Sequence, residues 1–164
     1  MLNRKKLNRI LFGSIAVIGL VLGIYETAEA GKSASTTALS KATVVKSISI
    51  SKNADLDFGA GYTGDAALTL DPNAQEGANF TVGGEANMAY NITLPSSTTM
   101  TTGDGVGADK QILVDTFSSN PATSGNIGSG GSQTLYVGAK RAALSNTQVS
   151  GAYSSIITVT VAYP

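Results

Sequence analysis

Two carboxylates, Asp55 and Asp57, come nearest in this sequence to a pair of residues that could do chemistry. They stand two positions apart, so their side chains share one face if the segment is extended. Such a pair could bind Ca²⁺, or act as general acid and general base in a hydrolysis. Aspartate also favours turns, because its side chain hydrogen-bonds to nearby backbone groups. We therefore expect a capped turn before Phe58 and Gly59 in place of a reactive pair.

A second acidic stretch, Gly103–Asp109, superficially resembles a calcium loop but lacks the ligand spacing of one, so we expect a flexible turn there. The chain has no histidine and no cysteine, which excludes Ser-His and Cys-His nucleophiles and metal sites with His or Cys ligands. We therefore expect a protein that is not an enzyme and that holds no cofactor and no metal.

The N-terminus has the form of a secretory signal peptide. A basic stretch, Asn3–Arg9, precedes an apolar run, Ile10–Ile24, and small residues follow at Ala28 and Ala30. A membrane anchor is the alternative, but this run is shorter than the roughly 20 residues that span a bilayer. We expect a signal-peptide helix in residues 1–30 that is cleaved after Ala30. Export then leads to the periplasm and the cell surface or medium of a Gram-negative bacterium.

Charge and cysteine content limit the functions that the mature part can have and the interactions that can stabilise it. The leader holds four of the 11 basic and two of the 11 acidic residues, so residues 31–164 carry 7 and 9, a net charge of −2. This weak charge argues against binding to nucleic acid or to an anionic membrane surface. An exported chain without cysteine must draw its stability from packing and backbone pairing, because disulfides are excluded.

The composition after residue 30 is rich in Thr, Ser, Ala, Gly and Val, and strand patterns recur between Gly, Asn, Asp and Pro. These features predict one all-β domain, an immunoglobulin-like sandwich of about seven short strands in residues 46–164, after an N-terminal extension in residues 31–45. Residues 95–109 and 118–132 are expected to be exposed connections. The expected strands are 43–50, 66–70, 79–82, 89–94, 111–117, 133–137 and 153–163.

The last predicted strand shows the clearest alternation. Apolar side chains fall on one face and mostly small or polar ones on the other, which indicates one buried face. The residues of the apolar face are Tyr153, Ile157, Val159, Val161 and Tyr163. The simplest interpretation is a terminal strand that completes the core.

This terminus resembles that of chaperone–usher pilus subunits, which end in an alternating strand with a penultimate aromatic residue and a glycine fourteen residues from the end. Tyr163 and Gly151 occupy those positions. The resemblance implies a pilin-like fold in which a periplasmic chaperone, and later the N-terminal extension of the next subunit, adds a strand beside the last one. It assigns Gly151, Tyr153, Ile157, Val159, Val161 and Tyr163 to that assembly strand.

A second resemblance covers about residues 49–163. Segments in the family's order along the chain are similar to the secreted bacterial family called domain of unknown function 4402. They are Ala54–Gly59, Ala78–Gly84, Tyr90–Pro95, Leu135–Gly138, Gly151–Tyr153 and Val159–Tyr163. Members of that family are similar to pilin-like and coat-like domains, which supports fold and location more than function.

Residues 31–45 are a weak donor strand, because one phase of the alternation carries small side chains and the other carries Lys41. A disordered leader to the first strand is the alternative.

We expect an exported structural or adhesive subunit of a surface fibre or coat, with neighbouring copies, pilin-like subunits and a periplasmic chaperone as partners. The alternative is a self-complete sandwich that binds a ligand such as a glycan through its loops, where Tyr62 is the loop tyrosine.

Overall fold

A computed structural model describes residues 33–164, and the chain divides after Thr43 into two units that are described separately. The predicted signal peptide, with its cleavage residues Ala28 and Ala30, lies outside the described residues. Residues 33–43 form no helix or strand, and Leu39 within them is 79% exposed. In residues 33–164 no helix is long and apolar enough to cross a membrane.

Residues 44–164 are built from strands, with one short 3₁₀ helix, η2, at Ala108–Lys110. The strands have between 2 and 10 residues. Thr, Val and Ile recur within them, and Gly, Asn, Asp and Pro recur between them, as the composition predicts. They are β1 Ser49–Ala54, β2 Leu68–Thr69, β3 Ala78–Gly83, β4 Ala89–Thr93, β5 Ser97–Thr101, β6 Gln111–Asn120, β7 Ser124–Asn126, β8 Ser132–Arg141 and β9 Thr160–Ala162.

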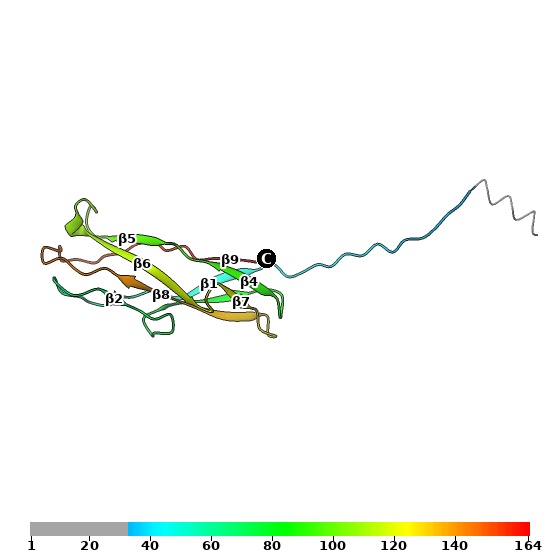
Figure 1. Cartoon of the computed structure of the whole chain (residues 1–164), viewed down its shortest axis with the longest axis horizontal. Coiled ribbons are helices and arrows are strands. Elements are labelled where there is room, and N and C mark those ends of the chain that lie inside the picture. Colours follow the sequence, from blue (N-terminus) through cyan, green and yellow to red (C-terminus); the bar gives the residue numbers. More distant parts are fainter. Residues whose placement is uncertain (1–32) are drawn as a thin grey trace, which may run out of the picture. The chain divides into compact units, whose positions relative to one another are not determined.

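The strands form two antiparallel sheets (Figure 1). The larger sheet has the order β1-β3-β8-β6-β5, and β2 also pairs with β8. The smaller sheet has the order β7-β4-β9. Thus β1 pairs with β3 alone at one edge of the larger sheet, and β9 pairs with β4 alone at one edge of the smaller.

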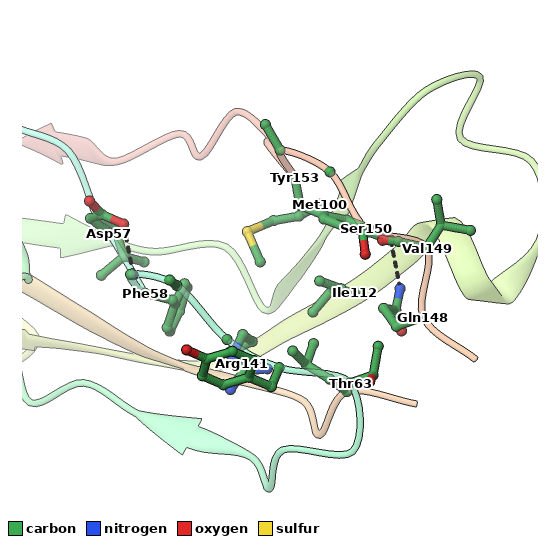
Figure 2. Close-up of a pocket in the computed structure, with 18 residues that line it drawn as sticks. Asp57, Phe58, Thr63, Met100, Ile112, Arg141, Gln148, Val149, Ser150 and Tyr153 are labelled. Atoms are coloured by element: carbon green, nitrogen blue, oxygen red, sulfur yellow. Dashed lines mark hydrogen bonds between the residues drawn. The ribbon is translucent and has the colours of Figure 1, made fainter. Parts of the chain in front are cut away.

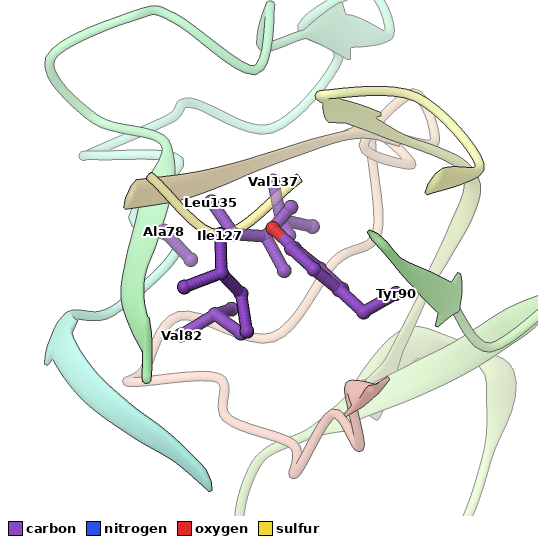
Figure 3. Packing of buried hydrophobic residues seen from close by; sticks show 6 residues of the cluster. All are labelled: Ala78, Val82, Tyr90, Ile127, Leu135 and Val137. Atoms are coloured by element: carbon purple, nitrogen blue, oxygen red, sulfur yellow. The ribbon is translucent and has the colours of Figure 1, made fainter. Parts of the chain in front are cut away.

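The core lies between the two sheets (Figure 3). The larger sheet contributes its inward side chains from β3 and β8, the smaller sheet contributes Tyr90 from β4, and Ile127 follows β7. Burial of these apolar side chains is the main favourable term in folding. The cluster consists of Ala78, Val82, Tyr90, Ile127, Leu135 and Val137. The predicted all-β sandwich is confirmed.

Tyr90 is the largest buried side chain, and its hydroxyl has no hydrogen-bond partner within residues 33–164. Burial raises the pKa of this hydroxyl above its ordinary value. A buried polar group without a partner costs free energy. We expect Tyr90→Phe to leave the free energy of unfolding unchanged or to raise it by about 1 kcal/mol, as measured by urea unfolding. Tyr136→Phe, at a residue 37% exposed, is the control, and a clear loss in Tyr90→Phe alone would contradict the expectation.

A close crossing lies at the middle of β8. On one side of this strand β3 pairs with residues 132–137 and β2 with residues 140–141. The chain between β2 and β3 passes Gly138, where a Cβ would overlap the carbonyl oxygen of Leu70 and lie 2.6 Å from the Pro72 nitrogen. Only a residue without a side chain fits there.

Several predicted strands need correction. The first lies at 49–54 and not at 43–50, because Val44 and Val45 are exposed, whereas Ile48 and Ile50 pack against the core. Two strands, β5 and β7, lie inside the stretches predicted as connections. The β5 strand is rich in threonine and turns Thr98 and Met100 inward, whereas β7 (Ser-Gly-Asn) has no apolar side chain to mark it. The last predicted strand, 153–163, pairs only near its two ends.

Candidate functional site

The C-terminal segment, residues 153–163, has the predicted alternation. All five residues of the predicted apolar face are half-buried, and Ile156 between them is 90% exposed. Val159, Val161 and Tyr163 pack against the core cluster, while Tyr153 and Ile157 line a cavity. The structure thus places this face toward the interior along its whole length.

The backbone of the same segment is only partly paired. Ser154 exchanges two hydrogen bonds with Thr101, of 3.0 and 3.1 Å, and β9 pairs with β4. Between them, residues 155–159 make no backbone hydrogen bond to any residue in 33–164. We call residues 155–159 the open edge. Unpaired N–H and C=O groups in a row are a template for another strand.

A cavity of about 560 Å³, which we call the groove, is bounded by the open edge and by β1. Its floor includes core-facing side chains of the larger sheet, among them Phe80, Met100 and Val114. On the other boundary, Lys52 and Ala54 belong to the edge strand β1, whose outer side has no partner strand in residues 33–164. Two unpaired strand edges and an apolar floor between them have the shape that an added strand would fill.

Tyr163, the penultimate residue, holds both ends of the domain together. Its hydroxyl donates to the Lys46 carbonyl at 2.9 Å and accepts the Glu85 amide hydrogen at 2.7 Å. Lys46 is tied in turn to the Glu85 carboxylate, which accepts its backbone N–H at 2.9 Å. The hydroxyl lies directly over Gly84, where a Cβ would overlap it. Tyr163 therefore has a structural role within the domain.

Removing that hydroxyl is expected to loosen the start of the domain. Tyr163→Phe leaves the half-buried Glu85 amide and the Lys46 carbonyl without this partner, and we expect a loss of about 1–2 kcal/mol in the free energy of unfolding. Guanidinium unfolding measures it, and Tyr62→Phe, at a residue 81% exposed, should change nothing. Equal stability of the Tyr163→Phe variant and the unmodified protein would contradict this.

Gly151 and Tyr153 begin the segment in a tightly packed corner. A Cβ on Gly151 would lie 2.6 Å from Thr102 Oγ1, so the glycine permits a close approach there. The Tyr153 hydroxyl lies 2.7 Å from the Val149 carbonyl oxygen and 2.9 Å from that of Asp109. These contacts fix the direction in which the open edge leaves the corner.

The carboxylates singled out in the sequence are each engaged locally. Asp57 accepts the Gly59 amide hydrogen at 2.8 Å, which confirms the capped turn, and Asp55 pairs with Lys52 at 2.6 Å on the surface. The hydrogen bond from Lys110, at 2.9 Å, holds the pKa of Asp104 below its usual value. The same hydrogen bond raises the pKa of Lys110. In residues 33–164 no three acidic side chains gather in a way that could hold a metal ion.

Comparison with known proteins gives a family for the chain. A family model described as "Domain of unknown function (DUF4402)" matches residues 37–163. The chain belongs to this family. No curated protein and no solved structure matches the chain. The match spans β1 to β9 and therefore includes both the open edge and the groove of the DUF4402 domain.

The sequence did not indicate that two polar residues of this DUF4402 domain are buried. Gln148 is buried in a polar loop, and its amide nitrogen donates to the carbonyl oxygens of Asp109 and Gln111 at 2.8 and 3.2 Å. Arg141 is also buried, at the end of β8, and the sequence pair Lys140-Arg141 is typical of a solvated loop. Nothing in composition or spacing marks either residue as interior, because their partners are backbone atoms of distant segments.

Proposed function

We propose that this protein is an exported structural subunit of a bacterial surface fibre or coat, and that it assembles by β-strand addition. The observation that carries the proposal is the open edge beside the groove. Its five consecutive residues have no backbone partner in residues 33–164, and two of them, Ile157 and Val159, turn half-buried side chains inward. A strand placed there would pair with backbone groups and cover apolar floor at the same time.

Two further observations support a structural role over a catalytic one. The chain lacks histidine and cysteine, and the aspartates singled out in the sequence serve a turn (Asp57) and surface ion pairs (Asp55 and Asp104). The basic and apolar leader supports export, with the periplasm and then the surface or medium as destinations. The partners that fit are a periplasmic chaperone, neighbouring pilin-like subunits, or further copies of this chain.

The N-terminal extension is the candidate donor. Residues 33–45 form no helix or strand and are exposed, and Leu39 and Val44 are 79% and 93% exposed. An exposed apolar residue in a segment without structure is available to a neighbour. Its small side chains offer modest burial, so we expect each contact to be weak and the backbone pairing to matter more.

The test is to add a peptide covering residues 31–50 to the purified protein and to follow hydrogen exchange. We expect the amides of residues 155–159 to exchange fast alone and to become protected with the peptide, and thermal stability to rise with peptide concentration. A peptide with Leu39, Val44 and Val45 changed to aspartate is the matched control. A stable monomer whose amides at 155–159 are protected without any partner, and which ignores the peptide, would refute the proposal.

A second candidate function is ligand binding by a self-complete domain. One observation favours it: Tyr62 is 81% exposed and lines a second cavity, beside the loop 59–64. An exposed aromatic ring that lines a cavity suits a sugar, because the ring can pack against the sugar's apolar C–H face. A glycan array with the unmodified protein and a Tyr62→Ala variant tests it, and only a signal that depends on Tyr62 supports this function.

A further inference from the structure

A buried arginine borders the second cavity of the domain, which has a volume of about 530 Å³ (Figure 2). Arg141 is 7% exposed, and its Nη2 donates to the Ala66 carbonyl oxygen at 3.2 Å. Its Nη1 is enclosed and has no hydrogen-bond partner in residues 33–164. The ion pairs of these residues, Lys52–Asp55 and Lys110–Asp104, do not include it. A guanidinium held away from water without an anion is costly.

Gln148, the other buried polar residue that lines this cavity, is already satisfied by the protein. The Gln148 amide nitrogen donates to two carbonyl oxygens and to the Tyr153 hydroxyl, and its amide oxygen accepts the Ser145 N–H at 3.4 Å. The rest of the lining is mixed: Phe58, Met100, Ile112 and Leu144 form its apolar part, and Asp57, Thr63 and Ser150 belong to its polar part. Figure 2 shows Arg141 across the pocket from Met100 and Tyr153. Arg141 is the one cationic side chain of this lining, and its free guanidinium nitrogen beside the apolar part of the cavity favours a ligand with one anionic group and an apolar body.

We propose that this cavity is a binding site for a small carboxylate with an apolar body, such as an aromatic or short aliphatic carboxylate, and that Arg141 receives the carboxylate. The volume lies within the range of about 300–1,000 Å³ that is typical of small-molecule sites. The guanidinium suits a carboxylate because it donates along two parallel N–H directions. The ligand proposed for this cavity is not the strand that is proposed to fill the groove. Residues 33–48 contain no acidic side chain that could pair with Arg141.

The part of the cavity wall next to Arg141 controls whether an anion can reach its guanidinium group. Because Nη1 has no open surface, contact with an anion requires a side-chain rearrangement there. Gly61 is part of this wall: a Cβ on it would lie 3.0 Å from Leu144 Cδ1, 3.4 Å from Asp65 Oδ2 and 3.9 Å from Arg141 Cζ. The Asp65 carboxylate accepts the Tyr62 N–H at 2.7 Å and forms no ion pair with Arg141 within residues 33–164. Glycines at 59 and 64 have positive φ values of 65° and 87°, a backbone conformation that glycine adopts without steric cost.

The experiment uses the unmodified protein, expressed from the whole sequence. Benzoate and hexanoate are the probes, and benzamide, hexanamide and acetate are the controls. Titrations followed by amide NMR give each dissociation constant. We expect benzoate and hexanoate to shift the amides of residues 58–64, the uncharged amides to bind roughly 10- to 100-fold more weakly, and acetate to bind more weakly than hexanoate.

Two variants keep the proposal open to refutation. Arg141→Gln should weaken benzoate binding to the level of benzamide. Gly61→Ala keeps the guanidinium and has a backbone that alanine can adopt, and it should also weaken binding because its methyl group occupies the wall beside Arg141. Equal affinity for benzoate and benzamide, no binding of either carboxylate at millimolar concentration, or unchanged benzoate affinity in both variants would overturn the proposal. Strand addition is tested separately at residues 155–159, so failure of one does not imply failure of the other.

Discussion

Gly138→Ala is expected to lower the free energy of unfolding by about 3 kcal/mol, the upper end of the usual range for overpacking. The added Cβ would meet backbone, with the Pro72 nitrogen at 2.6 Å, the Asp71 carbonyl carbon at 2.8 Å and the Leu70 oxygen overlapped. A backbone cannot move aside as the end of a side chain can, so the crossing itself must open. Leu70 N–H, which donates to the Ala139 carbonyl at 2.9 Å, would be displaced with it.

Gly130→Ala is the matched control for this change. A Cβ on Gly130 has no heavy atom within 4 Å, and its φ is not positive. The control variant should therefore unfold within about 0.5 kcal/mol of the unmodified protein in urea. Equal stability of the two variants would contradict the close packing of the β2–β3 connection against Gly138.

Ile157→Asp is expected to abolish strand addition at the groove, with binding of the 31–50 peptide weakened by at least about 100-fold. This prediction rests on the proposed function. Ile157 is half-buried and lines the groove together with Phe80 and Val114, so a carboxylate there would face apolar floor beneath any added strand. Calorimetry of peptide binding measures the effect, at a temperature where circular dichroism shows the variant to be folded.

The neighbouring residue provides the control. Ile156→Asp makes the same chemical change one position earlier, at a side chain that is 90% exposed. We expect its stability to change by less than about 0.5 kcal/mol and its peptide affinity to stay near that of the unmodified protein. A folded Ile157→Asp variant that binds the peptide as well as Ile156→Asp does would contradict the role of the groove.

The fold was predictable from the sequence where side chains carry a strong alternation. The clearest case is the segment 153–163, whose inward face is the one that the sequence indicates. Its pairing was not predictable, because alternation reports burial and says nothing about which backbone lies alongside. For the same reason the open edge at 155–159 could be found only in the structure.

Elements held by backbone pairing alone escaped prediction. The short strand β7 pairs with β4 through Ser124, Gly125 and Asn126, and its contribution to the interior is the absence of a side chain at Gly125, against which the Tyr90 ring packs. Arg141 was missed for a related reason: a charged residue beside Lys140 predicts solvent, and its burial depends on the distant loop 59–66 folding over it.

The two hydrogen bonds of the Tyr163 hydroxyl have a consequence for biosynthesis. Lys46, one of its partners, lies 117 positions earlier, and β9 pairs with β4, which is also made far ahead of it. Lys46 and β4 are therefore synthesised long before Tyr163 and β9, with which they pair. The pair β4–β7 can form earlier, but the third strand of the smaller sheet is added last. A chain cut before residue 160 would lack Val161 and Tyr163, which pack against the core cluster.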